Sequence, residues 1–434
     1  MQHLLFFRPL VFCLMATTLF AGDDHTFFVE SIEFEGLRHV SESILRAELK
    51  LKDGEFYSED QLRGGQYRLD RLAFIWRSEI ALRKGSRRGA YRLVITIEET
   101  RRFFWLLQPS LIFTREHYLG SNEPGDSEVH LGLSALSLGY RWFFRKSELR
   151  LQAPGLLSYV HYDLFGTGTV FNTGFGPTPG EWNPDNSFGR SPFPVENQLA
   201  DITFSSNALF GYLALSFPVG QDRWLNINGF GSDGDLESLE PLSGAVLEYE
   251  NTSLSFGNFS LNWTYNTTDH PTFTTSGLVL QVGAARDWLS FDFNESNSAP
   301  AYQKWERDMG FFVARRFWEL KPDQTFAALF NASWGHNRHE SRNALVPSNY
   351  SSGKFGLDFL FGRNYLDRRF WKKNRDFRLE ARMGYHHNAS GLDGVWPESE
   401  YGQYEVEFSF TARDNFGTLR FGLQYESTDR GLWP

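Results

Sequence analysis

The sequence predicts a mainly β fold, in which one small α/β domain precedes a transmembrane antiparallel β-barrel of about 12 to 16 strands. Up to Glu99 the apolar residues fall at both helical and strand spacing, whereas from Phe103 onward they alternate with a period of two. The alternating segments are long, close to the roughly 9 to 11 residues that cross a bilayer obliquely. Phe numbers 42, so aromatic side chains are abundant enough to cover an outer surface.

A secretory signal is expected over residues 1–21. One Arg precedes an apolar stretch, and the small Ala21 is followed by acidic residues. This pattern favours a cleaved signal over the alternative, a membrane helix, which would be longer. Cys13 is the only cysteine and lies within the signal, so the mature chain has no thiol for a disulfide, a metal site or a nucleophile. The net charge of −10 argues against a nucleic-acid partner.

The α/β domain is expected over residues 27–100, with the order β-α-α-β-β. After a first strand, Ser41 can cap one helix and Ser58 can begin a second. Residues 78–84 and 91–99 then alternate as two strands joined by a Gly- and Arg-containing turn. A unit of this size can bury one small core.

The barrel is expected over residues 101–434. Strict alternation fits either a soluble β domain with its apolar face inward or a membrane barrel with that face outward. Charged residues such as Arg378, Glu380 and Glu405 occupy the polar face, which suits a wet lumen, and aromatic residues crowd the strand ends. These features favour the membrane barrel. The alternation slips near Ala135, which predicts a bulge or a strand break there.

The longest clear loop is expected at residues 174–198, which are rich in Gly, Pro and Asn. Long loops of membrane barrels lie on the outer face. The histidines His336, His339, His386 and His387 are interpreted as solvated or interface residues, because no carboxylates stand beside them at ligand spacing. No metal site and no cofactor are expected.

The first domain resembles a polypeptide-transport-associated (POTRA) domain across residues 28–99. The matching features are "EFEG", "HVS", the leucines of the helices, "KDGEFYSEDQL" and the closing "ITIEE". Later, "YDLFGTGT" and "WTYNTTDHPTFTTSGLVLQ" resemble two stretches of the bacterial surface antigen barrel. The chain therefore resembles the outer-membrane protein assembly and secretion superfamily, which includes BamA, TamA and the two-partner secretion transporters.

The resemblance implies a barrel in the outer membrane of a Gram-negative bacterium, with the POTRA domain in the periplasm. The partners it implies are the outer-membrane bilayer and unfolded outer-membrane or secreted protein clients. Periplasmic chaperones or accessory lipoproteins are further partners to expect. Three features depart from the family pattern: the chain has no Arg-Gly-aromatic tripeptide, it has a single POTRA domain, and it ends in "STDRGLWP" rather than at an aromatic residue.

Two candidate sites follow from the resemblance. The first is a client-binding edge strand in the POTRA domain, made of Arg77, Ser78, Glu79, Ile80, Ala81, Leu82 and Arg83. The second is the barrel seam, where the first strand near 103–114 would separate from the last near 418–426. The seam residues are Leu107, Pro109, Leu111, Leu419, Phe421 and Leu423. Pro109 either weakens this seam or marks a bend where the chain leaves the POTRA domain.

The first expected function is assistance in the insertion or translocation of proteins at the outer membrane. The alternatives are a passive pore or structural barrel that has lost the assembly activity and, third, a dedicated two-partner-type secretion transporter. An enzyme is not expected, because no nucleophile stands beside a base in the chain.

Overall fold

The computed structural model describes residues 26–70, 72, 74–119, 127–153, 155–177, 181–182, 202–241, 247–270, 273–293, 302–341, 348–370, 373–392, 399–414 and 417–432. These residues divide into two compact units: residues up to Thr100 together with the short segment Thr268–Thr272 form the first, and Arg101–Thr267 with Phe273–Pro434 form the second. The expected signal over residues 1–21 lies outside the described residues. No helix among the described residues is long and apolar enough to cross a membrane.

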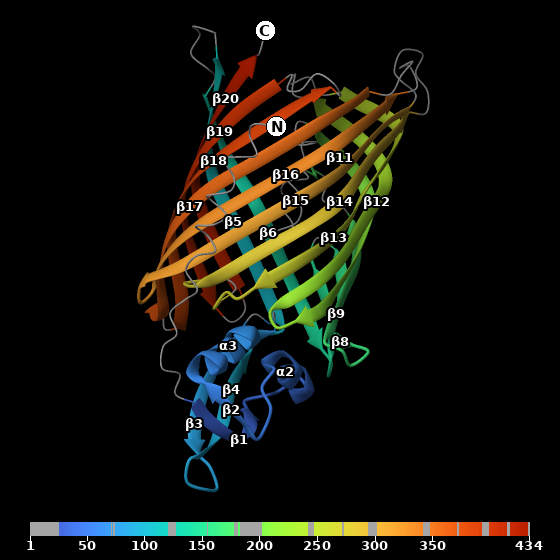
Figure 1. The fold of residues 1–434 in the computed structure, drawn as a ribbon. Coiled ribbons are helices and arrows are strands. Elements are labelled where there is room, and N and C mark those ends of the chain that lie inside the picture. Colours follow the sequence, from blue (N-terminus) through green and yellow to red (C-terminus); the bar gives the residue numbers. More distant parts are fainter. Residues whose placement is uncertain are drawn as a thin grey trace. The chain divides into compact units, whose positions relative to one another are not determined.

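The N-terminal unit is a four-stranded sheet with two helices (Figure 1). Its elements are β1 (Thr26–Glu35), α2 (Glu42–Leu49), β2 (Glu55–Ser58), α3 (Glu59–Asp70), β3 (Ile75–Lys84) and β4 (Ala90–Glu99). The strand order is β2-β1-β4-β3. The observed order is β-α-β-α-β-β, so the expected order β-α-α-β-β missed β2, the strand between the two helices. β2 has only four residues, too few to show an alternating pattern in the sequence.

Side-chain caps fix the N-terminal ends of both helices. Ser41 caps α2 by accepting the N–H of Ser43, and Lys50 ends the helix in the left-handed conformation. At the start of α3, Ser58 and Gln61 bond each other's backbone N–H reciprocally, which is a capping box. The core between the helices and the sheet is apolar, and its fully buried members include Val29, Leu45, Leu49, Leu69, Ile75, Leu93 and Ile95.

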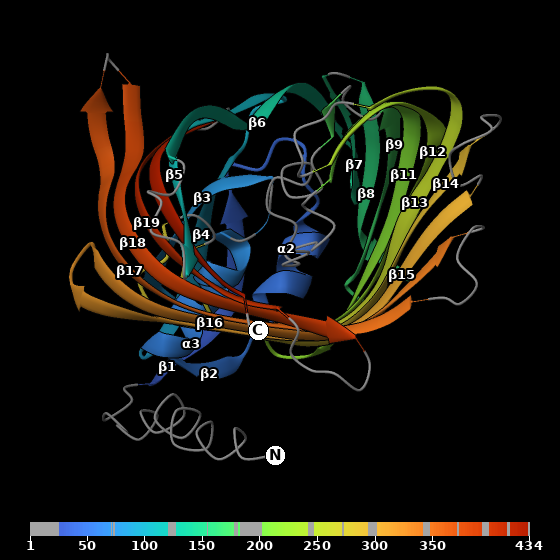
Figure 2. The ribbon, with the colours of Figure 1, turned by 90° about the horizontal axis from the view of Figure 1, so that it is seen from above.

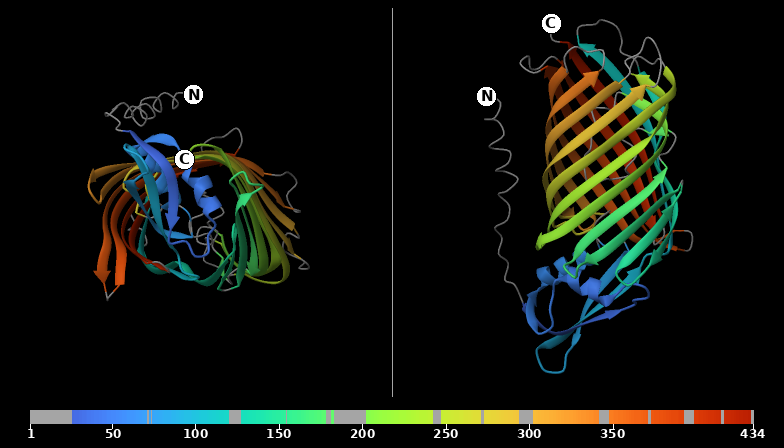
Figure 3. Two further views of the ribbon diagram at one scale, coloured as in Figure 1. Left: turned by 90° about the horizontal axis from the view of Figure 1, so that it is seen from below. Right: turned by 90° about the vertical axis from the view of Figure 1, so that its right-hand side faces the viewer.

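The second unit is a closed barrel of long, tilted strands (Figure 3). Its strands are β5 (Phe103–Leu119), β6 (Ser127–Phe143), β7 (Ser147–Gln152), β8 (Leu156–Leu164), β9 (Thr169–Pro177), β11 (Ile202–Gly220), β12 (Arg223–Pro241), β13 (Leu247–Asn266), β14 (Gly277–Phe293), β15 (Tyr302–Lys321), β16 (Gln324–Ser341), β17 (Ser348–Phe370), β18 (Lys373–Leu392), β19 (Ser399–Asp414) and β20 (Gly417–Leu432). We call the rim at which the chain enters at Phe103 the near rim and the opposite end the far rim.

Fifteen strands close the ring among the described residues. The sheet has 16 strands, but the two-residue β10 (Glu181–Trp182) pairs only beside β11, and β9 pairs directly with β11. Neighbours around the ring are antiparallel except at the closing pair, where β20 lies parallel to β5 (Figure 2). An odd number of alternating strands requires one parallel pair, so the expected antiparallel barrel is interrupted at that point.

The barrel presents apolar side chains outward, as the sequence predicted. Phe408 and Met383 are exposed at 56% and 60%, whereas Asp358 is exposed at only 1%. Outward apolar and inward polar residues are the arrangement of a transmembrane barrel. The predicted slip near Ala135 is confirmed, because Gln108 pairs with Ala135 and Pro109 with Leu133, which leaves one extra residue on β6. Most of the predicted loop 174–198 lies outside the described residues.

Candidate functional site: a sheet edge, a barrel seam and a luminal charge network

The predicted edge strand is β3, and it lies at the edge of the N-terminal sheet. The Ser78 N–H donates to Asp70 Oδ1 at 2.8 Å, and the Ser78 carbonyl accepts from Gln66 Nε2 at 2.7 Å. Side chains of α3 therefore occupy both backbone groups that Ser78 turns away from β4. This end of the edge is closed to an incoming strand.

In the remaining part of β3, the hydrogen bonds show which residues turn their backbone N–H and C=O groups toward β4 and which turn them away. Gly85 N–H donates to the Ala90 carbonyl, so Gly85 faces β4. In an antiparallel strand the direction alternates from one residue to the next. Ala81, which is opposite Val94, therefore faces β4, whereas Ile80 and Leu82 turn their N–H and C=O groups outward. The open part of the edge runs from Ile80 to Lys84.

The predicted seam residues lie together where β20 meets β5. Thirteen residue pairs join the two strands, from Gly417 opposite Trp105 to Gly431 opposite Leu119. Leu419 lies opposite Leu107, and Leu423 lies opposite Leu111. The seam is therefore closed along most of its length.

Pro109 lies inside β5 and not at a bend between the two units. Leu138 of β6 is opposite Trp105 and accepts from Ala153 N–H on the β7 side. Trp105 therefore faces β20, and by alternation Pro109 does too. Pairing between β20 and β5 stops at Leu419 and resumes at Gly422. Pro109 has no backbone N–H, so it cannot donate a hydrogen bond to β20 at this interruption.

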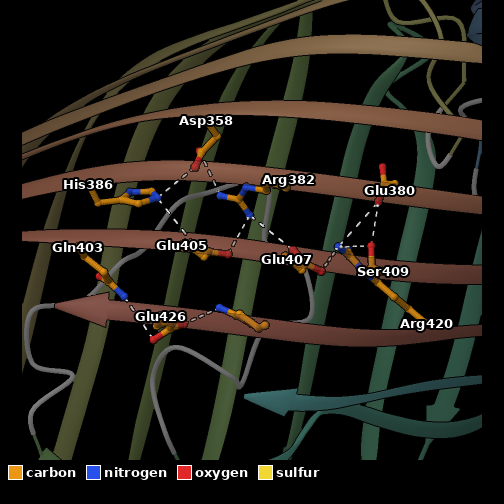
Figure 4. Close-up of polar contacts among 11 residues, drawn as sticks. Asp358, Glu380, Arg382, His386, Gln403, Glu405, Glu407, Ser409, Arg420 and Glu426 are labelled. Atoms are coloured by element: carbon orange, nitrogen blue, oxygen red, sulfur yellow. Dashed lines mark hydrogen bonds and ion pairs between the residues drawn. The ribbon is translucent and has the colours of Figure 1, made fainter. Parts of the chain in front are cut away.

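A network of charged side chains covers the luminal face of β17 to β20 (Figure 4). Arg382 is its centre, with Nη2 at 3.1 Å from Asp358 Oδ2 and Nη1 at 3.7 Å from Glu405 Oε1. His386 Nε2 bonds Asp358 Oδ1 at 3.1 Å, and Arg420 Nη2 bonds Glu407 Oε1 at 2.7 Å. The network extends to Glu380, Gln403, Ser409 and Glu426. It ties four neighbouring strands together from the inside.

Glycines provide the space for this network. A Cβ on Gly384 would lie 2.0 Å from Asp358 Oδ1, and one on Gly362 would lie 2.6 Å from Arg378 Nη2. A side chain at either position would displace the Asp358 carboxylate or the Arg378 guanidinium. Gly362 on β17 and Gly384 on β18 therefore leave room for charged side chains of the neighbouring strand to lie across them.

Phe273 and Thr274, which precede β14, are anchored against the luminal wall at the near rim. Thr274 O accepts from Arg378 Nη1 at 2.8 Å and from Thr325 Oγ1 at 3.0 Å. Phe273 O accepts from Asn364 Nδ2 at 2.9 Å. This segment belongs to the "PTFTTSG" stretch that carries part of the family resemblance. Its backbone carbonyls thus bond side chains of three strands, β16, β17 and β18.

The sequence interpretation did not single out Asp358, Arg420 or Glu426, and it took His386 for a solvated or interface residue. His386 is 4% exposed and hydrogen-bonded to Asp358 rather than solvated. The available signal was its spacing, because His386 follows Arg382 by four residues and therefore faces the same side of the strand. Among the residues that the structure describes, no three His, Cys, Asp or Glu side chains are grouped so as to hold a metal ion.

Comparison with known proteins identifies the first unit. Residues 27–99 match the family model for POTRA, described as surface antigen variable number repeat. The first unit is a POTRA domain. The resemblance predicted for residues 28–99 is confirmed, and a POTRA domain joined to a transmembrane barrel supports the outer-membrane assembly and secretion superfamily. This combination also supports an outer-membrane location.

Two solved structures are similar to the chain at low sequence identity. BamA from Haemophilus ducreyi lacking POTRA domains 1–3 is 11% identical, with 92% of this chain and 80% of that chain covered at a TM-score of 0.36. CdiB from Acinetobacter baumannii is 9% identical, with 89% and 67% covered at a TM-score of 0.36. No curated protein sequence matches the chain.

Proposed function

We propose that the protein receives unfolded protein clients in the periplasm and assists their insertion into, or translocation across, the bacterial outer membrane. The observation that carries this proposal is the open edge of β3, where Ile80 and Leu82 turn backbone donors and acceptors away from the sheet. An extended client can pair with such an edge through main-chain hydrogen bonds, and this pairing does not depend on the client's side chains. The activity needs binding and release but no catalytic chemistry.

A passive barrel is the second candidate function. The thirteen residue pairs between β20 and β5 favour it, because a closed wall offers no template for an incoming strand at that place. The missing Arg-Gly-aromatic tripeptide agrees with it. Under this proposal the POTRA domain is retained without a client.

Depletion of the protein, followed by a census of the outer-membrane proteome, separates these functions. A broad loss of barrel proteins is the result expected for an insertase. Loss of one protein would instead indicate a dedicated secretion transporter, and an unchanged census would support the passive barrel. Re-expression of the chain should restore the lost proteins, which controls for indirect effects of depletion.

Sideways opening at the seam is the exit route that the family resemblance implies, and cysteine pairs test it. The mature chain contains no cysteine of its own. Leu107 and Leu419 are direct neighbours across the seam, as are Leu111 and Leu423, and pairs that oxidise efficiently are retained. Assembly that fails until a reductant is added would assign the exit to the seam. Full activity of a locked barrel would assign it elsewhere.

A further inference from the structure

The barrel wall has a second feature, a free strand edge on β6. β6 pairs with β5 along most of its length, from Ser127 to Tyr140. On its other side it pairs with β7 only from Gly139 to Phe143. Among the described residues, therefore, no strand lies beside the twelve residues Ser127–Leu138 on the side away from β5. We call this segment the β6 free edge.

The free edge exists because three strands are short. β7 has six residues, and β8 and β9 have nine each, whereas the other strands of the ring have 16 to 23. β7 ends at Gln152, whose carbonyl accepts from the Gly155 N–H at 2.8 Å. Figure 1 shows β8 and β9 near one rim, while β11 continues to the other. Among the residues that the structure describes, strands therefore fill the wall between β6 and β11 only at the end next to the near rim.

β6 and β11 cannot close this part of the wall by pairing with each other. They are separated by β7, β8 and β9, so their axes are four strand spacings apart, about 19 Å. On the side of β11 that faces β6, residues 202–208 have no partner in β9, which pairs only with Leu209–Ser216. In this stretch β10 pairs with Phe204 and Ser205 alone. Two residues of β10 thus show that a strand segment can add to this side of the wall.

The register identifies which backbone groups the β6 free edge presents. Leu138 faces away from β5, because its carbonyl accepts from Ala153 N–H. Counting through the bulge, the residues with the same direction are Leu136, Leu133, Leu131, Val129 and Ser127. Val129 and Leu131 also expose their side chains at 61% and 81%. Apart from the Leu138 carbonyl, these outward backbone groups meet no strand among the described residues, and Val129 and Leu131 make the outer face apolar.

We propose that the β6 free edge is the docking site for a transmembrane strand of an unfolded outer-membrane protein. The inference rests on the proposed function and names the place where the client enters the wall. Unpaired backbone groups are costly in the apolar layer, so the edge requires an extended partner. Its twelve residues match the length of one transmembrane strand. Its apolar outer face selects a strand that alternates in the same way.

Docking at this edge needs no separation of strands. The seam between β20 and β5 must lose thirteen residue pairs before it can accept a client, whereas no described strand has to leave the β6 free edge. A client strand there would continue the β6 ladder from the point where β7 ends. We therefore expect a barrel that is locked across the seam by a disulfide to retain its activity.

Disulfide capture in proteoliposomes tests the docking site. The mature full chain carries Leu131→Cys, and the probe is a urea-unfolded eight-stranded outer-membrane barrel domain with one cysteine in its last strand. The matched control is Leu261→Cys on β13, which is also exposed, at 45%, but lies in a strand paired on both sides. Capture at Leu131→Cys should exceed capture at Leu261→Cys by on the order of tenfold.

The outcomes separate this proposal from the proposed function. Equal capture at the two positions, together with capture at Leu423→Cys on β20, would overturn the β6 docking site and leave the insertase intact. A disulfide from Leu131→Cys to a second copy of the chain, formed without the probe, would also overturn it. If the chain captures the probe at no position and does not accelerate its folding, both the docking site and the proposed function fail.

Discussion

The two units bury opposite kinds of side chain although both are built on alternating strands. In the POTRA domain, Leu45 and Leu93 are completely buried. In the barrel, Arg378 and Asp358 are buried at 2% and 1% exposure, while Phe408 is exposed at 56%. The solvent explains the difference, because water surrounds the domain and lipid surrounds the barrel. The POTRA core is therefore held by area removed from water, and the luminal wall of β17 to β20 by ion pairs and hydrogen bonds.

The largest expected effect comes from breaking the luminal network at its centre. Arg382→Leu leaves Asp358, Glu405 and Glu407 without the cation they share. Loss of one partner costs about 3–5 kcal/mol where the remaining buried charge has no other partner. Glu407 keeps Arg420 and Asp358 keeps His386, so we expect a loss near the lower end of that range, about 3 kcal/mol. The urea midpoint of barrel unfolding in detergent, followed by gel mobility without heating, should fall accordingly.

The adjacent residue provides the control for this change. Met383 points outward and is exposed at 60%, so Met383→Leu should leave the urea midpoint nearly unchanged. Adding Asp358→Asn to Arg382→Leu should recover part of the loss, since one uncompensated charge is then removed. Equal midpoints for Arg382→Leu and Met383→Leu would contradict the view that ion pairs hold this wall.

A smaller effect is expected at the open edge of the POTRA domain, where two neighbouring prolines should behave differently. Ala81→Pro removes a ladder hydrogen bond to β4 and should destabilise the domain by about 1–3 kcal/mol. Ile80→Pro removes an outward donor and should leave the β3–β4 ladder intact, yet weaken client binding.

Circular dichroism of the purified domain and crosslinking of an extended client peptide together measure the two outcomes. The informative variant is Ile80→Pro, since it separates binding from folding. If it remains folded and still crosslinks the peptide as the unchanged domain does, β3 is not the client-binding edge.

Much of the architecture could be predicted from the sequence because it depends on periodicity. The change of period after Glu99 gave the domain boundary, and the phase slip near Ala135 gave the bulge. Two features could not be read in this way. The direction of β20 relative to β5 depends on whether the number of strands is odd or even. The alternation of apolar and polar residues does not determine that number. The β6 free edge depends on how far β7, β8 and β9 extend, and partners in space decide that.

The luminal network shows a similar limit. The alternation of Arg378, Glu380 and Arg382 placed their side chains in the lumen correctly. It could not show that Asp358 and His386 meet across β17 and β18, because cross-strand contacts depend on register. His386 therefore looked like an ordinary solvated histidine in the sequence.

The smallest expected effect concerns Glu99 at the end of β4. It tests the POTRA side of the comparison at a carboxylate that backbone N–H groups surround. The carboxylate of Glu99 accepts the N–H groups of Arg38, His39 and Val40 at 2.9 to 3.1 Å. Burial alone would raise the pKa of Glu99, but these N–H donors and the His39 ring together hold the pKa below its ordinary value.

A carboxyl group with a lowered pKa in the folded state stabilises the fold above its unfolded pKa. This stabilisation is lost as the pH falls through the folded pKa. The purified POTRA domain should therefore lose stability between about pH 5.5 and pH 3, and Glu99→Gln should lose less, having already lost about 1 kcal/mol at pH 5.5. Glu79→Gln, on the exposed face of β3, is the matched control and should follow the unchanged domain. If the urea midpoints of all three proteins fall in parallel over this range, the backbone cradle around Glu99 does not contribute to the acid sensitivity of the domain.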